Sequence, residues 1–243
     1  MIDALGFKGI WKATTGAADL RVLQTLRTAL ETATLKRYLL KSLIPTNFAE
    51  RFELEPTVHV SSLSDTLVIA AVAPSVEPGQ SPDQDLPWGL VDLVCQCAAY
   101  VMRHAAQADR PLVYRGIVTV GPMLVDDTFL IGPAVDEASE LMDLADGAFV
   151  WLSPSAAALT PRPYFPNVWS TMAVEYALPL KQRGALTTTL LSPYVDTGDR
   201  AERAKIRQGY EAAMASTRVD VAIKRQNTLR FLDHVDRVHP AMT

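Results

Sequence analysis

Residues 58–71 carry two short apolar segments that meet at a polar turn: Val58-His59-Val60-Ser61-Ser62-Leu63-Ser64-Asp65-Thr66-Leu67-Val68-Ile69-Ala70-Ala71. The apolar and β-branched residues on both sides of the turn are those that strands prefer. The small polar residues between them are typical of a tight turn. The segment therefore predicts a hairpin with Asp65 at its turn. A carboxylate there either bonds to its own turn backbone or needs a positive partner.

The N-terminal residues offer a second carboxylate in a similar position. Asp3 lies at the end of an apolar strand, and a glycine-bearing loop leads from it to a helical pattern at Ala18–Lys41. A carboxylate beside a loop that enters a helix N-terminus suits a divalent cation with a phosphate chain. On adjacent central strands, Asp3 and Asp65 would have the geometry of two-metal phosphoryl chemistry, with the metals about 3.5–4 Å apart.

The composition indicates a globular protein of one large domain, or of a domain with an appendage. Of 243 residues 49% are hydrophobic, and 23 basic and 27 acidic residues give a net charge of −4. This charge argues against a general nucleic-acid binder. No apolar run approaches the roughly 20 residues of a membrane span, and Asp3 and Lys8 interrupt any signal peptide. Cys95 and Cys97 are too close in a helical pattern for a disulfide, so we expect a reduced, cytoplasmic protein.

Periodicity along the rest of the chain predicts alternating strands and helices. A helical stripe of apolar residues runs from Leu90 to Ala105. Strands are expected at 112–121, 123–131, 148–152, 172–180 and 185–191, and helices at 132–144, from 155 and from 199 onward. This order, βαββαβ with additions, predicts an α+β fold with a mainly antiparallel sheet and helices packed on it. Residues 1–193 would form the main domain and residues 194–243 a C-terminal helical extension.

Four motifs, in this order, resemble those of class III nucleotidyl cyclases. Asp3-Ala4-Leu5-Gly6-Phe7 and Ser64-Asp65-Thr66 look like the two metal-binding motifs of that family. Its next two landmarks look like Arg115-Gly116-Ile117-Val118-Thr119-Val120-Gly121 and Gly132-Pro133-Ala134-Val135-Asp136-Glu137-Ala138. The Arg-Gly pair before an apolar run is most similar to the bacterial pyrimidine cyclases of Pycsar anti-phage defence. The resemblance covers residues 1–193 and implies the family's ferredoxin-like core.

The resemblance also implies a two-metal active site. Asp3 and Asp65, with the main-chain carbonyl of Ala4, would bind two Mn²⁺ or Mg²⁺ ions per site. Backbone N–H groups of the following loop would hold the triphosphate, helped by the helix terminus; the residues are Phe7, Lys8 and Gly9. Taken alone, a lysine such as Lys8 is more often a solvated surface residue.

Two basic residues are candidates for stabilising the transition state. Arg115 lies within an apolar strand, where a guanidinium needs an anionic or carbonyl partner; it would reach a phosphate or brace a carboxylate across a dimer. Lys181 matches in position the late-strand lysine that cyclases use on the triphosphate, and is also consistent with an ordinary loop lysine. Well-studied members carry Asn and Arg where this chain has Asp136 and Glu140, an acidic pair that resembles Pycsar-like members. The transition-state cation is therefore left to Arg115 or Lys181.

Ser61 and Phe129 stand at the positions that select the base in this family. Lys at the Ser61 position favours adenine and Glu favours guanine, and Ser matches neither. Phe129 is an aromatic residue that can narrow the pocket or stack on a base. A smaller pocket suits a pyrimidine, so UTP is the expected substrate and CTP the second choice.

The resemblance thus implies a uridylate cyclase that forms a 3′,5′-cyclic mononucleotide and pyrophosphate. It implies a homodimer with shared active sites, and a separate cyclic-nucleotide-binding effector in antiviral defence. The alternative is a catalytically silent cyclase-like module that binds a nucleotide or a protein. Two features favour that alternative: the acidic pair Asp136 and Glu140, and the shortness of the first strand. Either the few residues before Asp3 are sufficient to form that strand, or the natural start lies upstream of Met1. A third option is an α+β domain of unrelated function.

Overall fold

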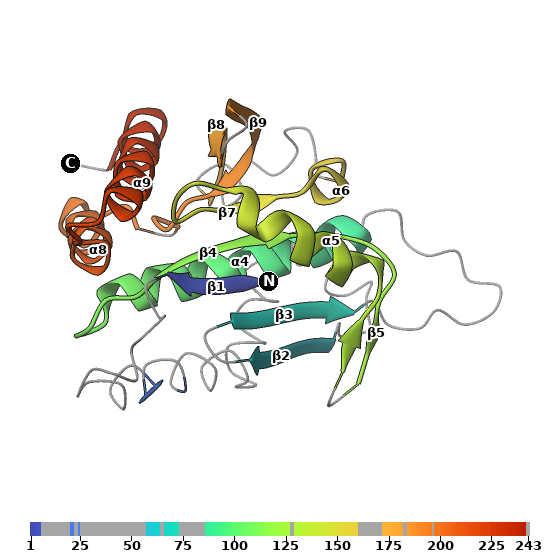
Figure 1. Ribbon diagram of the computed structural model, residues 1–243. Helices are drawn as coiled ribbons and strands as arrows, with labels where there is room; N and C mark the ends of the chain where they lie inside the picture. Colours follow the sequence, from blue (N-terminus) through green and yellow to red (C-terminus); the bar gives the residue numbers. More distant parts are fainter. Residues whose placement is uncertain are drawn as a thin grey trace.

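The computed structural model describes residues 1–5, 20–21, 24, 57–63, 66–72, 86–126, 129–159, 172–181, 184–195 and 197–241. The elements within these ranges are drawn in Figure 1. The strands are β1 (Ile2–Leu5), β2 (Thr57–Leu63), β3 (Thr66–Val72), β4 (Val113–Val118), β5 (Leu124–Val125), β6 (Leu130–Ile131), β7 (Val150–Leu152), β8 (Ala173–Leu180) and β9 (Gly184–Leu191). The helices are α4 (Leu86–Gln107), α5 (Pro133–Leu141), the 3₁₀ turn η2 (Met142–Leu144), α6 (Pro154–Ala157), α8 (Arg200–Ala213) and α9 (Val219–Val238).

Seven of these strands form one sheet in the order β2-β3-β1-β4-β7-β9-β8. Among the described strands, only β4 and β7 pair in parallel, and the other pairs are antiparallel. The predicted α+β class with a mainly antiparallel sheet is therefore confirmed. The predicted hairpin is present as β2 and β3, which pair along their whole length up to Leu63 and Thr66.

Helix α4 covers one face of the sheet, behind it in the view of Figure 1, and buries the predicted apolar stripe. It is also buried on its opposite side, because α8 crosses it there. A Cβ added to Gly209 of α8 would lie 2.7 Å from the carbonyl carbon of Ala106 in α4, so the two helix backbones touch. Cys95 and Cys97 of α4 are buried free thiols. None of the helices in the described ranges is long and apolar enough to cross a membrane.

The prediction of a single strand at 123–131 was wrong. The chain forms a hairpin there, in which β5 and β6 pair only with each other and project from the sheet (Figure 1). The amide of Asp126 donates to the carbonyl of Phe129 over 2.9 Å and closes the turn. Exposure of the apolar side chains is high in this hairpin: 71% for Leu124, 66% for Phe129 and 56% for Ile131.

The predicted C-terminal helix consists of two helices that pack on the sheet domain. Asp199 caps α8 by accepting a hydrogen bond from the amide of Ala201. Tyr210 of α8 and Phe231 of α9 are buried in the same cluster as Trp151 of β7. The boundary near residue 193 stays a prediction, and the helices beyond it contribute to a shared core. Most of the helix predicted at Ala18–Lys41 lies outside the described residues.

Candidate functional site

The site is organised by a row of three polar residues on neighbouring strands. Asp3 in β1 is directly opposite Thr66 in β3 and Arg115 in β4. Its chain neighbours Ile2 and Ala4 are buried in the cluster that contains α4. Because side chains alternate along a strand, Asp3 and its two partners face the other side of the sheet. The row thus brings together two predicted site residues that are 112 positions apart in the sequence.

Both carboxylate oxygens of Asp3 accept hydrogen bonds. The Thr66 hydroxyl donates to Oδ1 over 3.0 Å. The Arg115 guanidinium donates to Oδ2 from Nη2 over 3.1 Å and from Nε over 3.4 Å. The side chains of Asp3 and Arg115 are only 14% and 16% exposed, so the pair is largely shielded from water. Arg115 therefore braces a carboxylate of its own chain, and Asp3 already carries a positive partner.

A second carboxylate, Asp143 in η2, binds the same guanidinium. Arg115 Nη1 lies 2.6 Å from Asp143 Oδ1, and the Asp143 side chain is 65% exposed. This role of Asp143 was not predicted, because Asp143 is one of several acids near the end of a helical pattern. Thr66 was also missed, although its position next to Asp65 in the polar turn is a usable signal.

Lys181 lies next to this cluster. Its amide donates to the carbonyl of Leu144 in η2 over 2.9 Å, which ties the end of β8 to the turn that carries Asp143. Burial lowers the pKa of the Lys181 ammonium, and the positive charge of Arg115 lowers it further, while Asp143 acts in the opposite direction. The structure thus places both candidate cations, Arg115 and Lys181, around one acidic turn.

Gly116 has a steric reason to follow Arg115. A Cβ on Gly116 would lie 2.8 Å from Cα of Ile2 in β1, which is closer than real Cβ atoms approach a backbone. Only glycine lets β1 lie this close to β4, and that approach sets Asp3 against Arg115. The Arg-Gly pair is therefore a packing requirement of the row as well as a motif.

The main chain of Ala4 faces β3. Met1 and Ile117 exchange both backbone hydrogen bonds, over 2.8 and 2.9 Å. In an antiparallel pair such positions alternate, so the next pair that bonds in this way is Asp3 with Arg115. The polar backbone groups of Ala4 then point away from β4, toward β3 and the turn that precedes it. This orientation leaves the Ala4 carbonyl directed away from Arg115, on the side of β3.

The remaining predicted residues are dispersed or outside the described ranges. Ser61 is exposed on β2, opposite Val68, and lies on the same sheet face as Asp3 because Val68 is two residues from Thr66. Phe129 is at the turn of the projecting hairpin. The positions that depart from the family pattern, Asp136 and Glu140, are exposed on α5. Four further candidates lie outside the described residues: Phe7, Lys8, Gly9 and Asp65.

The described residues hold no group of three or more His, Cys, Asp or Glu side chains arranged for a metal. Asp3 supplies hard carboxylate oxygens of the kind that Mg²⁺ and Mn²⁺ prefer. The Arg115 guanidinium already lies beside Oδ2 of this carboxylate. Asp65 comes directly before Thr66, whose hydroxyl contacts Asp3. The carboxylate of Asp3 is therefore of the kind that suits a divalent cation, and in the described structure its partners are Thr66 and Arg115.

Comparison with known proteins finds similarity at the level of structure and not of sequence. No protein-family profile matches the chain, and no curated protein is similar to it in sequence. A solved structure that resembles it is the catalytic core of a rhodopsin-guanylyl cyclase with converted specificity, in complex with ATPαS. The sequence identity is 14%, the TM-score is 0.44, and the match covers 79% of this chain and 91% of that chain. A likeness of this degree leaves the chemistry to be argued from this chain's own residues.

Proposed function

We propose that this protein is a metal-dependent nucleotidyl cyclase that converts UTP, or as second choice CTP, to the 3′,5′-cyclic mononucleotide and pyrophosphate. The observation that carries the proposal is the cross-strand row of Thr66, Asp3 and Arg115. It joins the regions of three of the four motifs that resemble class III cyclases. Asp65, the second candidate metal ligand, comes directly before Thr66 in the sequence.

The metal ligands in this proposal are Asp3, Asp65 and the carbonyl of Ala4. Two bound Mn²⁺ or Mg²⁺ ions would supply activation of the ribose 3′-hydroxyl and neutralisation of charge on the leaving pyrophosphate. The sheet holds Asp3 in place from both sides, through the register with β3 and with β4. This rigid placement is what a two-metal site requires of its first ligand.

Arg115 and Lys181 are the proposed phosphate-binding cations. A guanidinium can form two parallel hydrogen bonds to a phosphate, as it does to a carboxylate. Arg115 is shielded enough for such bonds to be strong, and Lys181 lies beside the same acidic turn. Backbone N–H groups of Phe7, Lys8 and Gly9 would complete the triphosphate site. Asp136 and Glu140 on α5 are exposed acids and supply no positive charge for a phosphate.

The base would lie near Ser61, on the same sheet face as Asp3. A hydroxyl can donate to or accept from a pyrimidine edge. Phe129 projects from the hairpin with 66% of its surface exposed, so it would meet a nucleotide across a dimer interface. The same hairpin exposes Leu124 and Ile131, and such apolar clusters are typical of contact surfaces. This supports the proposed homodimer with shared active sites.

The cellular role follows from the resemblance to Pycsar cyclases. The cyclic pyrimidine nucleotide would be a cytoplasmic signal for a separate effector protein in anti-phage defence. A second candidate function, a catalytically silent nucleotide- or protein-binding module, is favoured by one contact. Arg115 satisfies the charge of Asp3 without any metal.

The test is incubation of the purified protein with each of the four nucleoside triphosphates and Mn²⁺, with products resolved by mass spectrometry. Asp3→Asn and Asp65→Ala are the test variants, and Glu175→Gln, an exposed acid on β8, is the matched control. We expect cyclic UMP or cyclic CMP from the wild type and the control, and a loss of about a thousandfold or more in the two test variants. A cyclic purine would contradict the roles of Ser61 and Phe129. Absence of any product would favour the silent module.

A further inference from the structure

Arg115 is shared between two carboxylates that belong to different elements. Nε and Nη2 point to Oδ2 of Asp3 in β1, while Nη1 lies 2.6 Å from Oδ1 of Asp143 in η2. The guanidinium has separate donors for each side. It can therefore release one carboxylate and keep the other.

The two carboxylates differ in how tightly they are placed. Asp3 is 14% exposed and is fixed by the sheet and by the Thr66 hydroxyl. Asp143 is 65% exposed, and its ion-pair partner among the described residues is Arg115. An exposed carboxylate loses little hydration when it forms more hydrogen bonds to a guanidinium. A shielded carboxylate, in contrast, needs a positive charge close to it.

The turn that carries Asp143 is itself anchored. The amide of Lys181 donates to Leu144 over 2.9 Å. Asn227 of α9 donates to the carbonyl of Asp146 over 2.8 Å, just after the turn. These backbone anchors come from two elements outside the row, β8 and α9, so the acceptor for Arg115 is positioned in advance.

A divalent cation and the guanidinium cannot share Oδ2 of Asp3 at low energy. Like charges about 4 Å apart repel by about 4 kcal/mol per pair of unit charges at a protein surface, and the cation carries two. A cation that binds Oδ2 of Asp3 must therefore displace Nε and Nη2 of Arg115.

We infer that Asp143 is a positioning residue that retains Arg115 when a divalent cation takes Asp3. Asp143 thereby lowers the cost of vacating Asp3 and keeps the guanidinium at the edge of the site, where phosphate would arrive. Without Asp143, Arg115 stays on Asp3 and competes with the cation. This inference rests on the proposed metal site.

The test is Mn²⁺ affinity measured by isothermal titration calorimetry without nucleotide. The proteins are the wild type, Asp143→Asn, Arg115→Gln and the double variant. Glu140→Gln is the control for loss of a nearby exposed charge, and thermal unfolding monitors folding. We expect Asp143→Asn to weaken Mn²⁺ binding about tenfold, and Arg115→Gln to strengthen it, as for coupled groups in contact. In the Arg115→Gln background, Asp143→Asn should change the affinity less than about threefold.

The outcomes separate this inference from the proposed function. Equal weakening by Asp143→Asn in both backgrounds means that Asp143 acts as a distant charge, which overturns the inference and leaves the metal site intact. No effect of Asp143→Asn in either background also overturns it. Absence of Mn²⁺ binding by the wild type overturns the metal site, and with it both proposals. Restored affinity in Asp143→Glu would support the positioning role.

Discussion

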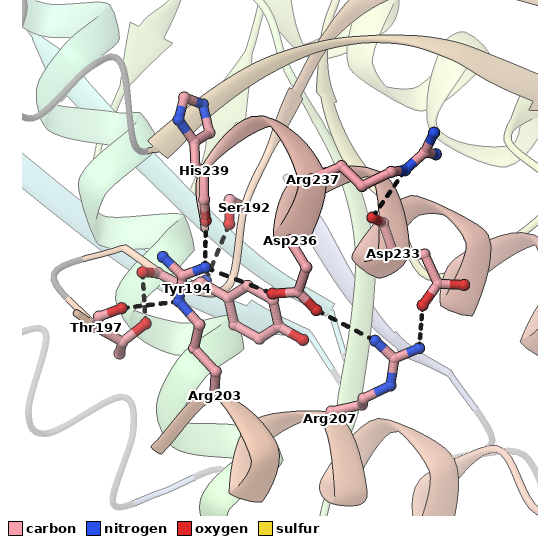
Figure 2. Close-up of polar contacts among 9 residues, drawn as sticks. All are labelled: Ser192, Tyr194, Thr197, Arg203, Arg207, Asp233, Asp236, Arg237 and His239. Carbon is pink, nitrogen blue, oxygen red and sulfur yellow. Dashed lines mark hydrogen bonds and ion pairs between the residues drawn. The ribbon is translucent and has the colours of Figure 1, made fainter. Parts of the chain in front are cut away.

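Arg203 in α8 and Arg115 in β4 are both shielded arginines with several oxygen partners, but the partners differ in kind. Figure 2 shows Arg203 between the segment before α8 and the end of α9. Its Nε donates to the carbonyl of Thr197 over 2.9 Å, and Nη1 donates to the carbonyl of His239 and, over 3.4 Å, to Asp236. The guanidinium also lies over the ring of Tyr194, 5.2 Å from its centre.

The partners of Arg115 are carboxylates in every contact described: Asp3 on one side and Asp143 on the other. Backbone carbonyls are fixed by the path of the chain, and a buried one without a donor destabilises the fold. A carboxylate carries its own charge, which a metal ion can neutralise as well as a guanidinium can. Arg203 is therefore suited to hold three chain segments together, whereas Arg115 is suited to exchange with a cation.

The largest expected effect is on stability when Arg203 is replaced. Arg203→Met removes the donor of two backbone carbonyls and should lower the free energy of unfolding by about 3 kcal/mol. Arg115→Met should cost less, about 1 kcal/mol, because Asp3 keeps Thr66 and Asp143 is exposed. Urea unfolding followed by circular dichroism measures both.

Mn²⁺ should affect the two arginine variants differently. A ligand that binds only the folded state stabilises it by mass action. Millimolar Mn²⁺ should therefore restore the stability of Arg115→Met, where the cation takes the vacated place beside Asp3, and should leave the deficit of Arg203→Met in place. Equal losses with equal responses to Mn²⁺ would show that the kind of oxygen partner does not separate the two arginines.

From the sequence, the helices and strands of the two regions could be predicted better than the contacts between them. Strand and helix periodicity located the elements, because the residues that alternate or recur every three to four positions are those that pack in the core. The apolar stripe on α4 was predicted in this way. Burial of the other side of α4 was not predicted. It depends on the close contact of α8 with α4 at Gly209, and glycine has no apolar side chain that would appear in a hydrophobic pattern.

The candidate site was also predicted in part. Asp3 and Arg115 each stood out as a charged residue in an apolar strand, but their contact depends on the register of β1 with β4. Asp143 could not be found, since its role is set by where α5 ends and how the turn is anchored. The partners of Arg203 are mostly backbone atoms, which no side-chain pattern reveals.

The next effect, of about 2 kcal/mol, concerns the glycines at the close contacts of the two regions. Gly209→Ala and Gly116→Ala each place a Cβ against a neighbouring backbone, and such overpacking typically costs about 1–3 kcal/mol. Only Gly116→Ala should also change Mn²⁺ binding, and should strengthen it, because it pushes β1, and with it Asp3, away from Arg115, the group that competes with the cation. Calorimetric titration of both variants measures this difference. A changed Mn²⁺ affinity in Gly209→Ala would mean that the α8 contact and the candidate site are coupled.

The smallest expected effect is a pH dependence in the region of Arg203. Burial, and then the positive charges of Arg203 and His234, hold the pKa of the His239 imidazole below its usual 6.5. The unfolded chain therefore takes up a proton near pH 6.5 that the folded chain accepts only at lower pH. Stability should be constant with respect to this group above pH 6.5, and should fall as the pH drops below it.

The size of this fall should be less than about 1 kcal/mol, because the imidazole is only partly shielded from water. His104 shifts in the same direction through burial and Arg103, so His104→Gln and His239→Gln should each remove part of the slope in urea unfolding between pH 5 and 7. His239→Gln keeps the backbone carbonyl that binds Arg203, so its stability at pH 8 should match the wild type. If the two stabilities differ, the His239 imidazole itself stabilises the Arg203 cluster. Arg203 would then depend on a side chain as well as on backbone carbonyls, and the contrast with Arg115 would be smaller.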